Sequence, residues 1–104
     1  METIELNGKK YYSEPIVEKG SEIKIVVLQR GWVLIGYFSR DGNNCSLTKA
    51  KVIRRWGTTK GLGELAVSIP SDTILDPCNG LVEFDILTVV LMISVNEDMW
   101  KKEL

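Results

Sequence analysis

Apolar and polar residues alternate along several short stretches of this chain, and some of these stretches become apolar at every position. Alternation is typical of a strand with one buried face, whereas a short continuous apolar run is typical of a strand covered on both faces. The pattern therefore predicts a mainly β protein of about six strands. The stretches are residues 3–6, 9–12, 22–28, 32–39, 50–56 and 81–95, the last of them either one long bent strand or two successive strands.

Turn-forming residues separate the predicted strands. Asn7-Gly8 is a strong short-range signal for a tight hairpin, because both positions of such a turn need positive φ. Residues 29–31 and 40–44 combine glycine with polar side chains and end two further strands. Gly36 lies inside an apolar stretch and predicts a bulge, a bend or the close approach of another backbone.

One segment has the periodicity of a helix instead. Its apolar residues share one helix face over about two turns, and a proline then ends it. Thr58 or Thr59 would lie near its start, as a cap or in an exposed hydroxyl-rich turn. Asn96 offers a cap for a second, frayed turn that contains Trp100. The residues of the predicted helix face and the closing proline are Leu62, Leu65, Ala66, Ile69 and Pro70.

Length and composition limit the number of domains. With 104 residues, of which 44% are hydrophobic, the chain is long enough for one domain with its own core and too short for two ordinary ones. We expect a single domain over residues 1–104, with an N-terminal hairpin in residues 1–20 and a core in residues 21–99. The fold class that follows is a rolled sheet or small barrel with one short α-helix, and the alternative is an α+β sandwich.

The charge balance gives no general attraction to polyanions. Lys and Arg number 13 and Asp and Glu number 14, so the net charge of -1 favours neither nucleic acid nor a membrane as partner. The most apolar run, residues 86–95, is too short to cross a bilayer and is interpreted as a buried strand. Residues 42–63 carry only basic charges and residues 64–98 only acidic ones. These two segments either form separate faces or pair as neighbouring strands and neutralise each other.

The side chains available for chemistry are few. Histidine is absent, which removes the commonest general base and metal ligand together. No acid–base pair or nucleophile setting is recognisable, so we predict no catalytic residue, metal site or cofactor, and no enzyme activity. Cys45 and Cys78 are expected to be reduced thiols of a cytoplasmic protein, because nothing resembling a signal peptide precedes them.

A basic turn, which we define as residues 54–60, is the most distinctive chemical feature. Guanidinium groups bind phosphate or carboxylate as a fork, indole stacks on planar rings, and backbone N–H groups beside glycines approach anions closely. These properties predict a site for a small anionic ligand of nucleotide type. The residues expected to form it are Arg54, Arg55, Trp56, Thr58, Thr59 and Lys60.

The same residues also have a purely structural interpretation. Strand alternation places Arg54 and Arg55 on opposite faces, so only one of them is expected beside Trp56. In the structural interpretation, Trp56 is a core aromatic and the arginines are solvated or paired with acids of the second half of the chain. Those acids are Glu64, Glu83 and Asp85.

Aromatic residues suggest a different class of function, a protein-interaction surface. Arg30, Trp32 and Trp100 are the candidate interface residues, although a core position is the favoured interpretation of Trp32. Strands that are apolar on both faces need cover that one short helix does not supply, so we also predict a homo-oligomer. A closed barrel that hides both faces within one chain is the alternative.

Six short motifs follow one another along the chain: Arg30-Gly31-Trp32-Val33, Gly36-Tyr37, Arg40-Asp41-Gly42, Leu47-Thr48-Lys49-Ala50, Arg54-Arg55-Trp56-Gly57 and Leu62-Gly63-Glu64-Leu65-Ala66. In this order they resemble a family of small uncharacterised proteins from tailed bacteriophages. The resemblance covers roughly residues 26–99, so the N-terminal hairpin lies outside it. It implies a phage protein that works in the cytoplasm of the bacterial host, in the contest with host defence.

Two functions follow from these observations. The favoured one is a small cytoplasmic binding protein that sequesters an anionic, nucleotide-type ligand at the basic turn. The alternative is an interaction module that inhibits a host protein or assembles with phage components.

Overall fold

The computed structural model describes residues 4–6 and 9–11 by their backbone and residues 22–104 in full. Strands β1 (Ile4–Leu6) and β2 (Lys9–Tyr11) pair antiparallel, with Leu6 opposite Lys9. The two strands predicted for the N-terminal hairpin are therefore confirmed. The predicted Asn7-Gly8 turn between them lies outside the described residues.

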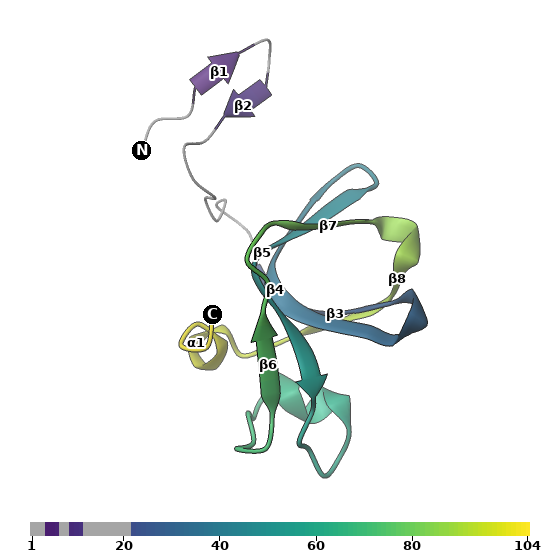
Figure 1. Cartoon of the computed structure of the whole chain (residues 1–104), viewed down its shortest axis with the longest axis vertical. Helices are drawn as coiled ribbons and strands as arrows, with labels where there is room; N and C mark the ends of the chain where they lie inside the picture. Colours follow the sequence, from purple (N-terminus) through teal and green to yellow (C-terminus); the bar gives the residue numbers. More distant parts are fainter. Residues whose placement is uncertain (1–3, 7–8, 12–21) are drawn as a thin grey trace.

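The core of the protein is an antiparallel sheet of six strands (Figure 1), which confirms the mainly β prediction. The strand order is β6-β5-β4-β3-β8, and β7 also pairs with β5. The predicted run 81–95 forms two strands, β7 and β8, whereas β6 was not predicted. The strands are β3 (Glu22–Leu28), β4 (Trp32–Asp41), β5 (Asn44–Arg55), β6 (Ile74–Pro77), β7 (Val82–Asp85) and β8 (Val89–Ser94).

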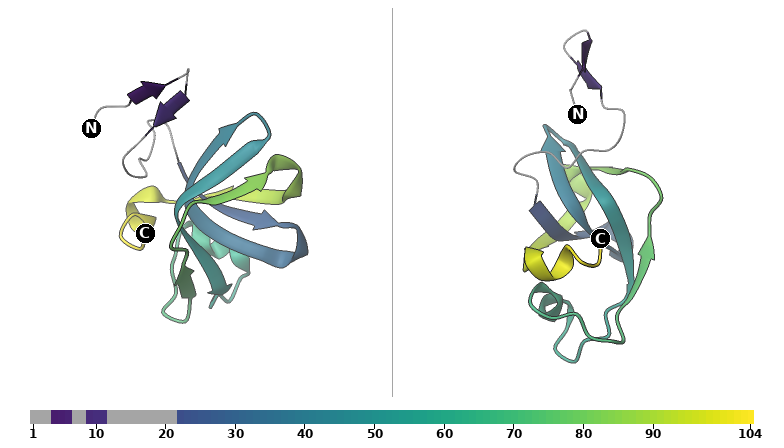
Figure 2. Two further views of the ribbon diagram at one scale, coloured as in Figure 1. Left: turned by 45° about the horizontal axis from the view of Figure 1, so that its top comes forward. Right: turned by 90° about the vertical axis from the view of Figure 1, so that its left-hand side faces the viewer.

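A short connection forces this sheet to roll. Strand β7 pairs with the first residues of β5, whereas β8 pairs with β3, so β4 and β3 separate β5 from β8 in the strand order. Only the 3₁₀ helix η3 (Ile86–Thr88) joins them, and three residues of such a helix rise about 6 Å. The edges of the sheet must therefore curl towards each other, as Figure 2 shows, although among the described strands no ladder closes the roll into a barrel.

The roll encloses the first of two hydrophobic clusters, which we call the inner cluster. Strands β3, β4 and β5 supply its buried residues, and β7 and β8 contribute from the two edges. Phe38 and Phe84 face each other across it with ring centroids 6.4 Å apart. The buried members are Val26, Leu34, Leu47 and Ala50, and the partly buried ones include Leu28, Val52, Val82 and Val89.

The outer cluster covers the opposite face of the same strands. Two segments close over it, the 3₁₀ helix η2 (Leu62–Ala66) and the C-terminal helix α1 (Glu97–Trp100), which lie next to each other in the right-hand view of Figure 2. Both faces of β3 and β4 are thus covered by this chain itself. The apolar faces alone therefore do not require a partner subunit. The buried members are Ile23, Ile25, Val33, Ile35, Ile53, Leu65 and Trp100.

Gly36 allows β4 and β5 to approach closely, as its position in an apolar stretch predicts. Ile35 lies opposite Lys51 and Tyr37 opposite Thr48, so β5 has one extra residue at this point and forms a bulge. A Cβ on Gly36 would lie 3.1 Å from the Ala50 Cα. The prediction of a bulge and of a close backbone approach is confirmed.

Trp100 joins the C-terminal helix to η2. Its side chain is 0% exposed, and its indole Nε1 donates a hydrogen bond to the Leu65 carbonyl at 2.8 Å. Asn96 caps the helix as predicted, because its Oδ1 accepts from the Met99 amide at 3.1 Å. The prediction that Trp100 is an interface residue is wrong, because its ring fills the space between η2 and the sheet. Trp32, in contrast, is 57% exposed, so the favoured interpretation of Trp32 as a core residue is wrong.

The predicted two-turn helix is a shorter 3₁₀ helix. Leu62, Leu65 and Ile69 do pack on the outer cluster, so the apolar face is confirmed. The helix is short because Gly61, at φ +93°, precedes it without a side-chain cap, and Val67 leaves helical geometry at φ -126°. Neither Thr58 nor Thr59 is therefore the cap.

Gly57 packs against the turn that precedes β6. Its φ is +71°, and a Cβ on it would lie 2.6 Å from both the Asp72 carbonyl carbon and the Thr73 nitrogen. Thr73 Oγ1 donates to the Trp56 carbonyl at 2.7 Å in the same place. The position requires glycine for both its φ and its contact.

We expect Trp100→Ala to lower the free energy of unfolding by about 3–5 kcal/mol, because it leaves a large cavity and an unpaired Leu65 carbonyl. The matched variant Trp32→Ala removes an exposed indole and should change the same quantity by no more than about 0.5 kcal/mol. Urea denaturation followed by circular dichroism measures both. Similar losses in the two variants would contradict the packing described for Trp100.

Gly57→Ala should be more destabilising than Gly61→Ala. Both place alanine at positive φ, which costs about 1–2 kcal/mol, but only Gly57 meets a neighbouring backbone, whereas nothing lies within 4 Å of a Cβ on Gly61. We expect the contact to add about 1 kcal/mol or more, measured by the same denaturation experiment. Equal losses would mean that the Gly57 contact is not tight.

Candidate functional site

The basic turn lies at one end of the sheet. Arg54 and Arg55 end β5, and residues 56–60 lead from it to η2 beside the β6 strand. Trp56 is 40% exposed and Thr58 is half-buried. The six predicted site residues thus run from the end of β5 into one surface loop.

Arg54 is bound to an acid of the protein. Its Nε lies 2.7 Å and its Nη2 3.4 Å from the two carboxylate oxygens of Asp76, in the fork geometry that guanidinium favours. This hydrogen bond, together with the carboxylate charge, raises the pKa of the Arg54 guanidinium above its ordinary value. Asp76 belongs to β6, so basic β5 pairs with acidic β6 and β7 as neighbouring strands. Of the two predicted charge arrangements, this is the one found.

A bulge changes the predicted orientation of the two arginines. Ile53 lies opposite Leu75, but Arg55 lies opposite Ile74, so β5 has one extra residue beside β6. Strand alternation is interrupted there. The alternation from which opposite faces were predicted for Arg54 and Arg55 therefore does not apply at this bulge.

Glu64 fills the anion-binding position of the turn. Its Oε1 accepts hydrogen bonds from the backbone amides of Thr59 at 3.2 Å and Lys60 at 3.1 Å, and it lies 3.5 Å from Thr59 Oγ1. The loop can therefore bind an anionic oxygen, and an internal carboxylate supplies it. Among the residues that the structure describes, the side chains of Arg55, Trp56 and Lys60 make no ion pair or hydrogen bond.

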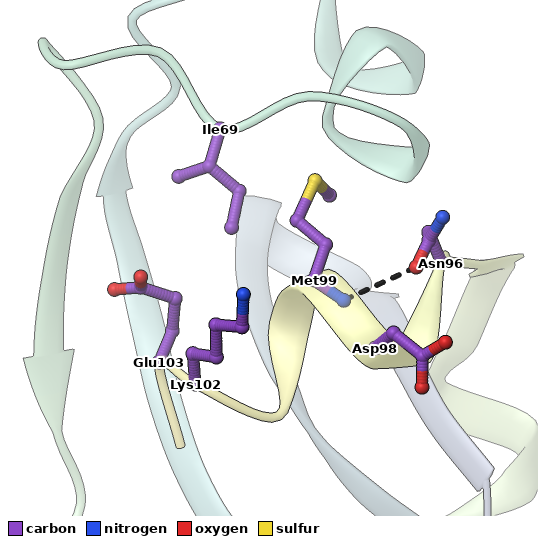
Figure 3. A pocket seen from close by; sticks show the side chains of 6 residues that line it. All are labelled: Ile69, Asn96, Asp98, Met99, Lys102 and Glu103. Atoms are coloured by element: carbon purple, nitrogen blue, oxygen red, sulfur yellow. Dashed lines mark hydrogen bonds between the residues drawn. The ribbon is translucent and has the colours of Figure 1, made fainter.

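A wide hollow lies away from this turn, between the segment after η2 and the C-terminal helix (Figure 3). Its volume is about 550 Å³ and its walls are mixed in charge. None of the predicted site residues lines it. The lining residues are Ile69, Asn96, Asp98, Met99, Lys102 and Glu103.

Strand β8 is an edge strand, which corrects its interpretation as a buried strand. In the described part of the chain it pairs with β3 alone, and Val90, Leu91 and Met92 are 61%, 46% and 38% exposed. An apolar run predicts a strand that is buried on both faces. Whether other segments bury that strand depends on its place in the sheet, and β8 lies at the edge. The sequence carries no signal for that place.

An apolar patch adjoins the start of β8 at the open end of the roll. Trp32 lies opposite Leu28 on β3, and Leu28 lies opposite Val89 on β8. Leu87, which is 76% exposed, lies two residues before Val89, and its carbonyl accepts a hydrogen bond from Gln29 Nε2 at 3.5 Å. We call Leu28, Trp32, Leu87, Val89 and Val90 the Trp32 patch.

Arg30 stands next to this patch in the turn between β3 and β4. It is exposed and has the left-handed conformation, with φ 72° and ψ 14°. Residues other than glycine, asparagine and aspartate seldom adopt this conformation. Arg30 and Trp32, both predicted interface residues, are both exposed and lie two residues apart at this turn.

Both cysteines are free thiols, as predicted. Cys45 is buried beside the inner cluster, and this burial raises the pKa of its thiol, with Arg40 opposing and Asp85 adding to the effect. A raised pKa disfavours the thiolate, which is the reactive form. Cys45 is therefore a packing residue.

Among the described residues, no helix is long and apolar enough to cross a membrane. No protein-family model matches the chain, and no curated protein matches it.

Proposed function

We propose that this protein is an interaction module that binds another protein at the Trp32 patch. The observation that supports this most is the exposure of Trp32 and Leu87 on two connections, residues 29–32 and 86–88, that a hydrogen bond from Gln29 to the Leu87 carbonyl brings together. Large apolar side chains grouped on a surface are typical of protein-binding sites. Catalysis forms no part of the proposal.

The chemistry of the patch favours a protein partner. Tryptophan and arginine are the residue types that contribute most to binding energy at interfaces, and Trp32 and Arg30 are two residues apart on the same turn. Leu28 and Val89 beneath them are half-buried members of the inner cluster, so the patch has a rigid base. Arg30 is the one charged residue of the turn Gln29–Gly31. Its positive charge beside the patch favours a partner with acidic residues around its own apolar surface.

The resemblance to tailed-phage proteins suggests where that partner is found. It favours a host protein that the module inhibits, or a phage component with which it assembles, in the bacterial cytoplasm. This origin is part of the proposal.

Trp32→Ser and Leu87→Ser should each weaken binding of the partner by about 2 kcal/mol or more, as loss of an interface anchor does. Tagged protein and each variant are used to capture proteins from a bacterial lysate, followed by quantitative mass spectrometry. Val67→Ser is the matched control, because Val67 is 74% exposed and lies outside the patch. A captured set that is identical for the three variants and the unchanged protein would contradict the proposal.

Binding of an anionic, nucleotide-type ligand at the basic turn is a second candidate function. The favourable observation is that two amides of this turn already hold the Glu64 carboxylate, beside the exposed Arg55, Trp56 and Lys60. A ligand must displace this carboxylate, so binding competes with an internal contact. That competition, and the pairing of Arg54 with Asp76, make this candidate weaker than the first.

Glu64→Gln tests this second candidate, because it removes the competing charge and keeps the side-chain length. We expect cyclic and linear nucleotides to raise the melting temperature of the unchanged protein, and to raise that of Glu64→Gln further. Arg55→Ala should abolish the shift, whereas Lys102→Ala, a cation far along the chain, should not. No shift across the panel, in the unchanged protein and in Glu64→Gln alike, would remove this candidate.

A further inference from the structure

We infer that the edge of β8 pairs with the β8 edge of a second copy of this chain, giving a two-fold symmetric dimer with a continuous sheet. This surface shares only Val89 and Val90, at the start of β8, with the Trp32 patch, and the residues that carry the inference are 91–94. The inference therefore goes beyond the proposed function and does not depend on it.

The sequence of β8 carries few of the features that normally keep an edge from pairing, and the η2 helix meets this strand near its C-terminal end, where the Asn96 amide donates to the Ala66 carbonyl at 2.8 Å. Edge strands are usually protected by charged side chains, proline or bulges. Residues Val89–Ser94 include no charge and no proline. One bulge is present, at the shift between Val27 and Leu28 of the β3 ladder, so its disruption is confined to the start of β8. Residues 91–94 continue in regular register with β3, and no other described strand pairs with them, so their second edge is a template for pairing.

The absence of charged residues from β8 favours a second copy of the same strand as its partner. In a two-fold antiparallel pair, a residue on the axis faces its own copy, and its neighbours face residues of the same segment. A charged residue near the axis would face a like charge, which is destabilising. Every pair formed within residues 91–94 is neutral, and the net charge of -1 adds little repulsion between whole molecules. The strand is thus complementary to itself.

Both hydrophobic clusters would extend across such a junction. Leu91 lies opposite Val27 and so belongs to the outer-cluster face, whereas Met92 lies opposite Val26 and belongs to the inner-cluster face. Leu91 is 46% exposed and Met92 38% exposed. A second β8 would cover apolar surface of both residues, one on each side of the sheet. A soluble peptide or partner strand with charges would not match both faces equally well.

Sedimentation equilibrium of the full chain, from micromolar to near-millimolar concentration, tests the inference. We expect a monomer–dimer equilibrium, and we expect Leu91→Lys to raise the dimer dissociation constant at least about tenfold, because it places two like charges near the axis. Val67→Lys adds the same charge at an exposed apolar position outside β8, after the end of η2, and should leave the constant unchanged. Circular dichroism checks that each variant is folded.

Disulfide trapping provides a second readout that does not rely on weakening the dimer. Residues at the axis of an antiparallel pair approach closely enough for a disulfide, so single cysteines at positions 91, 92 and 93, in a Cys78→Ser background, should give at least one crosslinked dimer on oxidation. Val67→Cys in the same background should give none.

The outcomes separate this inference from the proposed function. A concentration-independent monomer, or a dimer that Leu91→Lys leaves intact and no β8 cysteine traps, would overturn the β8 dimer. Partner capture that still depends on Trp32 would stand in either case. A dimer weakened by Leu91→Lys, trapped through β8 and indifferent to Val67→Lys would support it.

Discussion

The whole structure depends on one constraint: strands β3 and β4 are apolar on both faces, and both faces must be buried within a chain of 104 residues. The chain meets this in two ways. The roll buries the inner cluster, because the three-residue η3 link draws the two edges of the sheet together. Helices η2 and α1 bury the outer cluster, and the hydrogen bond from Trp100 to the Leu65 carbonyl joins them. These segments leave nothing, among the described residues, to pair with the free side of β8.

Contacts within the chain also explain why part of the basic turn is already occupied. A charge-rich loop beside β6 is stabilised when its cations and amides find acids of the same chain, and Asp76 and Glu64 serve this purpose. Part of the cationic group predicted to bind a ligand is therefore bound to acids of the protein itself. The exposed apolar residues, in contrast, are not used in this way. The balance of the two observations is what favours a protein partner at Trp32 over an anionic ligand at the turn.

Much of the fold follows from local pattern, and most of the site does not. The strand at residues 22–28, the Gly36 bulge and the Asn96 cap depend on neighbouring residues, so the sequence predicts them. Strand β6 was missed because Ile74-Leu75-Asp76-Pro77 is short and is paired only through β5. The exposure of Trp32, the burial of Trp100 and the edge position of β8 depend on which distant segments become neighbours. The residue type is the same for the exposed Trp32 and the buried Trp100. Which distant segments pack on each ring decides its exposure, and the local sequence does not show this.

Residue-resolved hydrogen exchange in dilute solution tests most directly whether one chain covers both faces of its sheet. The account predicts that central amides of β3 and β4 exchange only through global unfolding, at concentrations too low for association. Destabilising the outer cover, as with Trp100→Ala, should speed exchange about tenfold for each 1.4 kcal/mol of unfolding free energy that is lost. Rapid exchange of these amides in the dilute monomer, slowed only as copies associate, would contradict the account, because a partner rather than η2 and α1 would then be covering the sheet.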